Sequence, residues 1–244
     1  MTFVKNIRLY IDSDLILSCP CELNAKASHY LCNVMRCKEG DVISCFNERN
    51  GEFLSKIIKI DKKNSLIEPQ QLIKNNENIP DLWILFAPLK KDNTDFVIEK
   101  ATELGVTKII PVITQFTNTE KIKDERLLSQ AIEAAEQCER LSVPKIEKIS
   151  KLKDILNNWD NNRTIFFMNE RKGTQKIAEA FCKNRNKYAA ILVGPEGGFS
   201  EEEKKFIETF PFVESVSMGP RILRAETAVI SALSVWQSCN GDWI

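Results

Sequence analysis

The chain has 244 residues, 43% of them hydrophobic, which is enough to build a core in one large domain or two smaller ones. Its 34 basic and 34 acidic residues cancel, so a nucleic-acid partner would have to bind a local basic face rather than respond to the field of the whole molecule. No apolar run approaches the ~18 residues of a membrane span, and neither a secretory signal nor paired zinc-type spacing accompanies the eight cysteines, so we expect a cytoplasmic protein with reduced thiols and no metal.

The first part of the chain is predicted to be a small β-barrel. Residues 41–46 and 52–60 are strand-like runs separated by Asn50-Gly51, a dipeptide that tolerates the positive φ of a hairpin turn. Residues 75–81 are polar and contain a proline, which is typical of a linker. We therefore expect two domains, at residues 1–74 and 75–244.

The second domain alternates apolar strand-like runs with helical ones, which indicates βαβ units and a mostly parallel sheet. About six strands are expected, among them residues 83–88, 108–113, 164–168, 189–193 and 215–218. Helices are expected around residues 96–104, 125–139, 175–182 and 201–208. A last helix is predicted by apolar residues at helical spacing, namely Ala225, Ala228, Val229, Ala232, Leu233 and Trp236.

Two glycine-rich turns follow the last two of these strands. The first is Gly194-Pro195-Glu196-Gly197-Gly198, and Ser200 and Glu203 beyond it have the spacing of a capping box that begins a helix. The second turn contains Gly219-Pro220. Because open α/β sheets bind ligands at the carboxyl ends of their strands, the two turns predict a cleft for a nucleoside-like ligand.

Missing motifs restrict the chemistry of that cleft. The chain has neither G-x-G-x-x-G after a first strand nor a phosphate-binding G-x-x-x-x-G-K-[ST] loop, which argues against dinucleotides and ATP. It has one histidine and no G-x-S-x-G elbow, so Ser-His or Cys-His nucleophilic catalysis lacks its parts. Chemistry with an activated group donor remains.

Charged residues stand close to the glycine-rich turns. Arg221, Arg224 and Glu226 lie where the last helix begins, and there a carboxylate complements the helix dipole while arginines bind phosphate bidentately. Lys90 follows the strand at residues 83–88. At the end of a predicted helix, Glu133, Glu136, Gln137 and Arg140 recur at three- and four-residue spacing and share one face. A dipole partner, a salt bridge, or a solvated or intersubunit helix face would explain the same residues without a ligand.

Four ordered motifs resemble the RsmE family, the ribosomal small-subunit RNA (uracil-N3)-methyltransferases of the SPOUT superfamily. They are Lys90 with residues 99–106, residues 133–137, residues 194–200 and residues 219–228, while residues 29–41 resemble the family's N-terminal domain. The chain departs from the family's pattern at residues 114–118, where an arginine is usual, and at Lys90-Lys91-Asp92, where Lys-Gly-Asp is common.

The resemblance implies a fold, a cofactor and a reaction. The fold would be a PUA-like β-barrel followed by a SPOUT α/β domain with a mostly parallel sheet and a C-terminal trefoil knot, assembled as a homodimer. The reaction would be methylation of N3 of a specific uridine in small-subunit ribosomal RNA by S-adenosylmethionine, without a metal. The donor pocket would consist of Gly194, Pro195, Glu196, Gly197, Gly198, Met218, Gly219, Ile222, Leu223 and Ala228.

N3 of uracil largely keeps its proton at neutral pH, so a base must remove or share it. Glu226 is the first candidate base and Glu196 the second, with Arg224 or Arg221 to stabilise negative charge on the uracil carbonyl oxygens. The target base must also be splayed out of the folded RNA. The candidate RNA-binding residues are Lys5, Arg8, Arg36, Lys38, Lys90 and Arg140, all equally compatible with ordinary surface charge.

Three other functions remain open at this point. A SPOUT enzyme acting on another RNA or on a ribose hydroxyl would keep the donor site and change the barrel contacts. A non-catalytic RNA-binding assembly factor would keep the fold alone; Phe116, in the segment that departs from the family's pattern, is mild support for it, whereas the intact donor motifs argue against it. A nucleotide-binding regulator would bind ATP or GTP, which no phosphate-loop motif supports.

Overall fold

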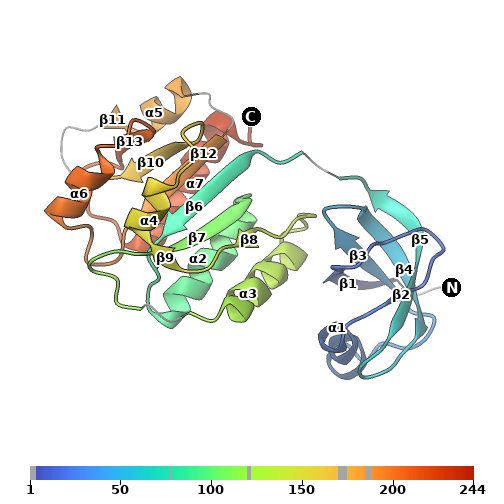
Figure 1. The fold of residues 1–244 in the computed structure, drawn as a ribbon. Coiled ribbons are helices and arrows are strands. Elements are labelled where there is room, and N and C mark those ends of the chain that lie inside the picture. The colour runs from blue at the N-terminus through green and yellow to red at the C-terminus, as the bar shows by residue number, and fades with distance from the viewer. Residues whose placement is uncertain (1–3, 77, 120–121, 170–174, 185–187) are drawn as a thin grey trace. The chain divides into compact units, whose positions relative to one another are not determined.

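The computed structural model describes residues 4–76, 78–119, 122–169, 175–184 and 188–244, so residue 77 of the expected linker lies outside the described residues. Within these ranges the chain forms two compact units (Figure 1). Unit 1 comprises Met1–Asn78 and Ala135–Val143, and unit 2 comprises Ile79–Ala134 and Pro144–Ile244. A short segment from the middle of the expected second domain therefore packs with the N-terminal residues.

Unit 1 is built on a five-stranded sheet in the order β1-β3-β4-β5-β2. Its elements are β1 (Val4–Tyr10), β2 (Cys21–Glu22), helix α1 (Ala25–His29), the π-helical segment η1 (Tyr30–Val34), β3 (Val42–Asn47), β4 (Gly51–Lys59) and β5 (Leu66–Lys74). Strand β1 is parallel to β3, and the other pairs are antiparallel. The two predicted strands are confirmed as β3 and β4, and Gly51 has the expected positive φ, +92°, beside the turn that joins them.

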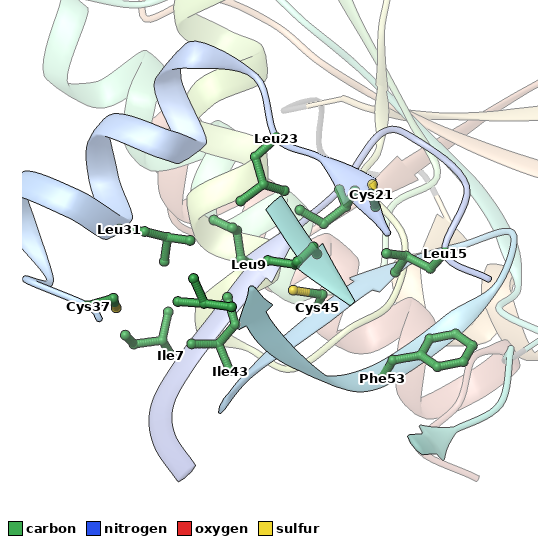
Figure 2. Packing of buried hydrophobic residues seen from close by; sticks show 13 residues of the cluster. Ile7, Leu9, Leu15, Cys21, Leu23, Leu31, Cys37, Ile43, Cys45 and Phe53 are labelled. Atoms are coloured by element: carbon green, nitrogen blue, oxygen red, sulfur yellow. The ribbon is translucent and has the colours of Figure 1, made fainter. Parts of the chain in front are cut away.

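The core of unit 1 is mainly aliphatic, with buried cysteines and Phe53 among its members (Figure 2). Ile7, Leu9, Ile43 and Cys45 come from the parallel pair β1 and β3 and pack together in it. Cys45 is fully buried, and burial raises the pKa of its thiol to about 12. A thiol in this setting stays protonated and packs as a small hydrophobic side chain.

Unit 2 contains an eight-stranded, all-parallel sheet with the order β11-β13-β10-β12-β6-β7-β8 and with β9 paired to β7. The strands are β6 (Asp81–Phe86), β7 (Lys108–Ile113), β8 (Lys145–Ile146), β9 (Ser150–Lys151), β10 (Thr164–Met168), β11 (Gln175–Lys176), β12 (Tyr188–Val193) and β13 (Val213–Ser217). The five runs named from the sequence are confirmed as β6, β7, β10, β12 and β13. The expected total of about six is wrong, because β8, β9 and β11 are two residues long and too short to carry a pattern.

Helices bury both faces of this sheet: α2 (Lys91–Glu103), α3 (Asp124–Gln137), α4 (Leu152–Asn157), α5 (Ile177–Lys183), α6 (Glu201–Ile207) and α7 (Ala225–Asn240). Two successive residues of β10 point to opposite faces of the sheet. The ring centroid of Phe166 lies 4.6 Å from that of Phe181 in α5, whereas the ring centroid of Phe167 lies 5.0 Å from that of Phe199, just before α6. Burial on both faces explains why these strands read as continuous apolar runs. The short helix α4 was not predicted.

Of the helices that the structure describes, none is long and apolar enough to span a bilayer. The described residues likewise bring together no cluster of three or more potential metal-binding side chains. The trefoil knot implied by the family resemblance stays a prediction.

Candidate functional site

A cavity of about 560 Å³ lies at the carboxyl ends of three neighbouring strands of unit 2. Met168 and Asn169 line it at the end of β10, Val193 and the first glycine-rich turn line it after β12, and Met218 with the second turn lines it after β13. The strand order β13-β10-β12 explains why the two turns converge. One turn follows β12 and the other follows β13, and these two strands lie on either side of β10 in the sheet.

The residues predicted to bind a methyl donor converge on this cavity. It is lined by Gly194, Pro195, Glu196, Gly198, Met218, Gly219, Ile222, Leu223 and Ala228. Gly197 is the predicted residue that the lining does not include. A Cβ at Gly197 would lie 3.2 Å from Cβ of Phe116, so its bare backbone faces that side chain instead.

The first turn is held by close packing and backbone hydrogen bonds. The N–H of Gly198, a residue with φ +70°, donates to the Pro195 carbonyl at 2.9 Å. A Cβ at Gly194 would lie 2.5 Å from the ring of Phe199, so no side chain fits there without moving that buried ring. The predicted capping box is confirmed, because the Ser200 hydroxyl accepts from the N–H of Glu203 and the Glu203 carboxylate accepts from the N–H of Ser200.

The second turn leaves more space. Gly219 has φ +104°, and a Cβ built on it would meet nothing within 4 Å. Glycine is therefore needed here for its backbone conformation and not to avoid a neighbour.

Positive charge predominates among the ionisable side chains of the lining, which are Lys90, Lys204, Arg221, Arg224 and Glu196. Lys204 is paired with Glu201 at 3.1 Å, whereas Arg221 and Arg224 are exposed at the approach to α7. A ligand with anionic groups, or the phosphates of an RNA, would be favoured at this opening.

Glu226 lies in the first turn of α7, between Ala225 and Ala228, which both line the cavity. The side chain is half-buried and is not itself among the lining residues. Its Oε2 is buried and has no hydrogen-bond partner among the residues that the structure describes. A buried carboxylate oxygen without a partner is costly and calls for a functional explanation.

Arg8, a predicted RNA contact, is occupied inside unit 1. Its guanidinium pairs with Glu52 at 2.9 Å, donates to the carbonyls of Ala135 and Arg140 at 2.7 and 2.8 Å, and lies 3.6 Å over the ring of Phe46. These contacts bind the segment Ala135–Val143 to the sheet. Arg8 is therefore not available to an RNA phosphate, contrary to its prediction as an RNA contact.

The other predicted RNA contacts are dispersed. Arg36 and Lys38 are exposed just after η1, whereas Lys90 precedes α2 and lines the cavity. Arg140 belongs to the cluster around Arg8 and bonds the Ser142 hydroxyl at 2.8 Å. Lys5 lies in β1, but its side chain is outside what the structure describes.

Several lining residues were missed from the sequence, namely Asn93, Phe167, Met168, Asn169, Val193, Phe199, Lys204 and Ala225. A signal was present for the group at the end of β10, because that strand was predicted and its carboxyl end lies at the same sheet edge as the two turns. Lys204 carried no signal, since one lysine in a charged helix does not reveal which way it points.

Comparisons with known proteins find relatives that are RNA methyltransferases. An RNA methyltransferase domain model matches residues 75–237, and an RNA methyltransferase PUA domain model matches residues 23–70. The chain is 37% identical over 233 residues to ribosomal RNA small subunit methyltransferase E of Rickettsia conorii, covering 95% of each chain. It is 31% identical over 220 residues to the Bacillus subtilis protein of that name, covering 84% of this chain and 85% of the other.

Solved structures share the whole fold. A putative methyltransferase, Lpg2936 from Legionella pneumophila, solved with bound S-adenosylmethionine, aligns with a TM-score of 0.87 at 29% identity and covers 98% of this chain and 100% of its own. The ribosomal RNA small subunit methyltransferase E of Neisseria gonorrhoeae aligns with the same TM-score at 24% identity. These alignments confirm the predicted fold class, a PUA-like domain followed by a SPOUT-type α/β domain.

Proposed function

The chain belongs to the family of RNA methyltransferases that carry a PUA domain, and on that premise we propose that it methylates N3 of a uridine in small-subunit ribosomal RNA with S-adenosylmethionine. The observation that carries the proposal is the cavity at the carboxyl ends of β10, β12 and β13, which gathers both glycine-rich turns. The names of the relatives support the RNA class. The uracil-N3 position is our inference.

The cavity suits a ligand of this kind. Its volume of about 560 Å³ lies within the range of small-molecule sites. Leu223 and Ala228 offer apolar surface, and the Gly219 turn offers open backbone without a side chain in the way. The bound donor would supply an electrophilic sulfonium methyl group.

The proposed reaction requires a base for the N3 proton and a cation to stabilise the negative charge on uracil. The uracil nitrogen forms a bond to the methyl carbon as the carbon–sulfur bond breaks, so the N3 proton must leave for a base. Glu226 carries an unpartnered buried oxygen that would accept this proton, and Glu196 on the cavity wall is the second candidate. Arg224 or Arg221 would stabilise charge on the uracil carbonyl oxygens.

The proposed enzyme has further parts. Unit 1, with exposed Arg36 and Lys38, would bind phosphates of the RNA, as would Lys90 and Arg140. We further propose a homodimer that works in the cytoplasm. Domains at residues 1–74 and 75–244 remain our proposal, with Ala135–Val143 packing onto the first.

The reaction is tested by transferring labelled methyl groups from S-adenosylmethionine to small ribosomal subunits from cells that lack this modification, followed by nucleoside analysis. Label in N3-methyluridine at one site is the expected result. Label in another base or on a ribose hydroxyl would replace the uracil-N3 assignment with a different RNA reaction. Donor binding without any transfer would favour an assembly role.

Two matched variants test the base. Glu226→Gln keeps size and removes the charge, so we expect kcat to fall at least 100-fold with donor affinity within twofold of the parent. Glu196→Gln makes the same change on the cavity wall, where we expect a smaller loss. Full activity in Glu226→Gln with a large loss in Glu196→Gln would transfer the base role to Glu196.

A further inference from the structure

Phe116 is a large apolar side chain left 43% exposed beside the candidate site. It lies in the turn that follows β7, and its Cβ and Cγ would be 3.2 and 3.7 Å from a Cβ built on Gly197. The two residues on either side of Gly197, Glu196 and Gly198, both line the cavity. Gly197 therefore leaves room for the aromatic side chain at the edge of the site.

The backbone that carries Phe116 is fixed on both sides. Thr114 and Thr117 close the turn, with the N–H of Thr114 bonded to the Thr117 hydroxyl at 2.8 Å and the N–H of Thr117 bonded to the Thr114 carbonyl at 3.2 Å. The N–H of Gln115 donates to Oε1 of Glu203 at 2.7 Å.

Glu203 joins this turn to the donor-site turn. Its second oxygen, Oε2, accepts from the N–H of Ser200 at 3.0 Å, directly after the glycine-rich turn. One carboxylate thus connects the segment bearing Phe116 to the start of α6. An exposed ring on a hydrogen-bonded backbone is suited to binding, because the backbone that carries it has little freedom left to lose.

We propose that Phe116 is a stacking surface for an unpaired nucleobase of the RNA, next to the nucleotide that enters the cavity. This inference rests on the proposed function. A base splayed from its helix exposes two apolar faces, and proteins that bind single-stranded RNA commonly cover such faces with aromatic rings. A phenyl ring accepts any base, so Phe116 would strengthen RNA binding with little sequence preference.

The test measures RNA and donor binding separately in Phe116→Leu, Phe116→Trp and the parent. RNA affinity is measured with small-subunit ribosomal RNA and S-adenosylhomocysteine present, and donor affinity with S-adenosylmethionine alone. For Phe116→Leu we expect RNA affinity about 10-fold weaker and donor affinity unchanged. Phe116→Trp keeps a larger aromatic face, so it should bind RNA at least as tightly as the parent.

Phe96→Leu is the matched control, since Phe96 is 39% exposed on α2 of the same unit and is not among the residues that line the cavity. It should leave RNA affinity within twofold of the parent. Equal losses in the two leucine variants would overturn the proposal, as would a Phe116→Trp variant that binds like Phe116→Leu. A Phe116→Leu variant of altered molecular mass in light scattering would instead assign the ring to contact with a second copy of the chain.

Failure of the inference and failure of the proposed reaction are distinguishable. If the parent methylates RNA and Phe116→Leu binds it normally, only the stacking role is overturned. If the parent binds RNA in a Phe116-dependent way but transfers no methyl group, only the reaction is overturned. A parent that binds no RNA overturns both.

Discussion

Single residues at the candidate site are constrained in different ways, and the glycines show this best. Gly194 is required because the ring of Phe199 fills the space of a side chain, whereas Gly219 is required because its φ of +104° strains any other residue. Gly197 has no such φ but lies against Phe116. The sequence shows three similar glycines, and only their neighbours in space separate their roles.

Gly219→Ala is expected to weaken donor binding beyond its effect on folding. The substitution places a Cβ at a positive φ, which costs about 1 kcal/mol of stability, and any relaxation moves a turn that lines the cavity. Gly40→Ala is the matched control, because Gly40 has φ +91°, also has open space around it, and lies in unit 1 away from the cavity lining. Urea unfolding and donor titration of both variants should give similar stability losses and a donor defect in Gly219→Ala alone. Equal donor affinities would remove Gly219 from the site.

Arg163 joins three strands of the unit 2 sheet at their amino ends, opposite the cavity. Its Nη1 donates to the carbonyl of Asp81 at 3.0 Å and to that of Ala189 at 3.1 Å, and its side chain is 5% exposed. Nη2 pairs with the Asp81 carboxylate, and the guanidinium lies 3.5 Å over the ring of Trp83. The contacts of one buried cation thus hold β6 and β12 beside the start of β10.

Asp81→Asn should destabilise unit 2 at neutral pH and much less in acid. Burial, the largest influence on the Asp81 pKa, acts to raise it, but hydrogen bonds from Arg163, Thr107 and Trp83 together with the Arg163 charge lower it. A carboxylate with a lowered folded-state pKa contributes stability above its unfolded pKa of about 3.9, and that stability is lost as the pH falls through the folded-state value.

We therefore expect Asp81→Asn to lose about 1–2 kcal/mol at pH 7, a loss kept small because the carboxylate is partly exposed, and we expect this loss to shrink as the pH falls through the folded-state pKa of Asp81 and the parent carboxylate takes up its proton. Urea unfolding at several pH values measures the difference. Asp154→Asn, an exposed change in the same unit, should stay within 0.5 kcal/mol of the parent throughout. If the difference in unfolding free energy between the parent and Asp81→Asn does not change with pH, the charge of Asp81 contributes nothing to stability.

Local sequence pattern predicts the longer strands and one helix start of unit 2. Runs such as β7 and β10, buried on both faces, were located from the sequence to the residue, and the capping box marked the start of α6. Strands of two residues, such as β8 and β11, hold their place by pairing with longer neighbours and leave no periodic signal. Both glycine-rich turns were found, but their separation by β10 in the sheet was not, because strand order is a long-range property.

The segment Ala135–Val143 is the clearest feature of the whole molecule that the sequence did not predict. Its backbone accepts hydrogen bonds from Arg8, the N–H of Tyr10 donates to Glu136 at 3.0 Å, and Ala135 and Leu141 pack against Phe46. Glu136 and Arg140 were expected to share a helix face. Instead Glu136 is half-buried and bonded to Tyr10, more than a hundred residues away in the sequence, and Arg140 lies beyond the end of α3, where its side chain donates to Ser142. Arg8, whose guanidinium holds this segment in place, is therefore not available to an RNA phosphate.

Because the charges of the whole molecule balance, RNA affinity has to come from local cations, and the number of phosphates that these cations contact sets the salt dependence of RNA binding. With 34 basic and 34 acidic residues, affinity must come from a few local cations such as Lys38, exposed in unit 1. If Lys38 contacts a phosphate, Lys38→Ala should reduce the slope of log K against log salt concentration by about 0.7, the value for one phosphate of a single strand.

Lys148→Ala removes the same charge from an exposed position in unit 2 that is not among the proposed RNA contacts, so it changes the net charge equally. Its slope should match that of the parent. The comparison, made by RNA titration between about 50 and 200 mM salt, separates a local phosphate contact from a general effect of net charge. Equal slopes in both variants would remove Lys38 from the RNA-binding surface and leave the cations around the cavity, Lys90 and Arg221 among them, to hold the RNA.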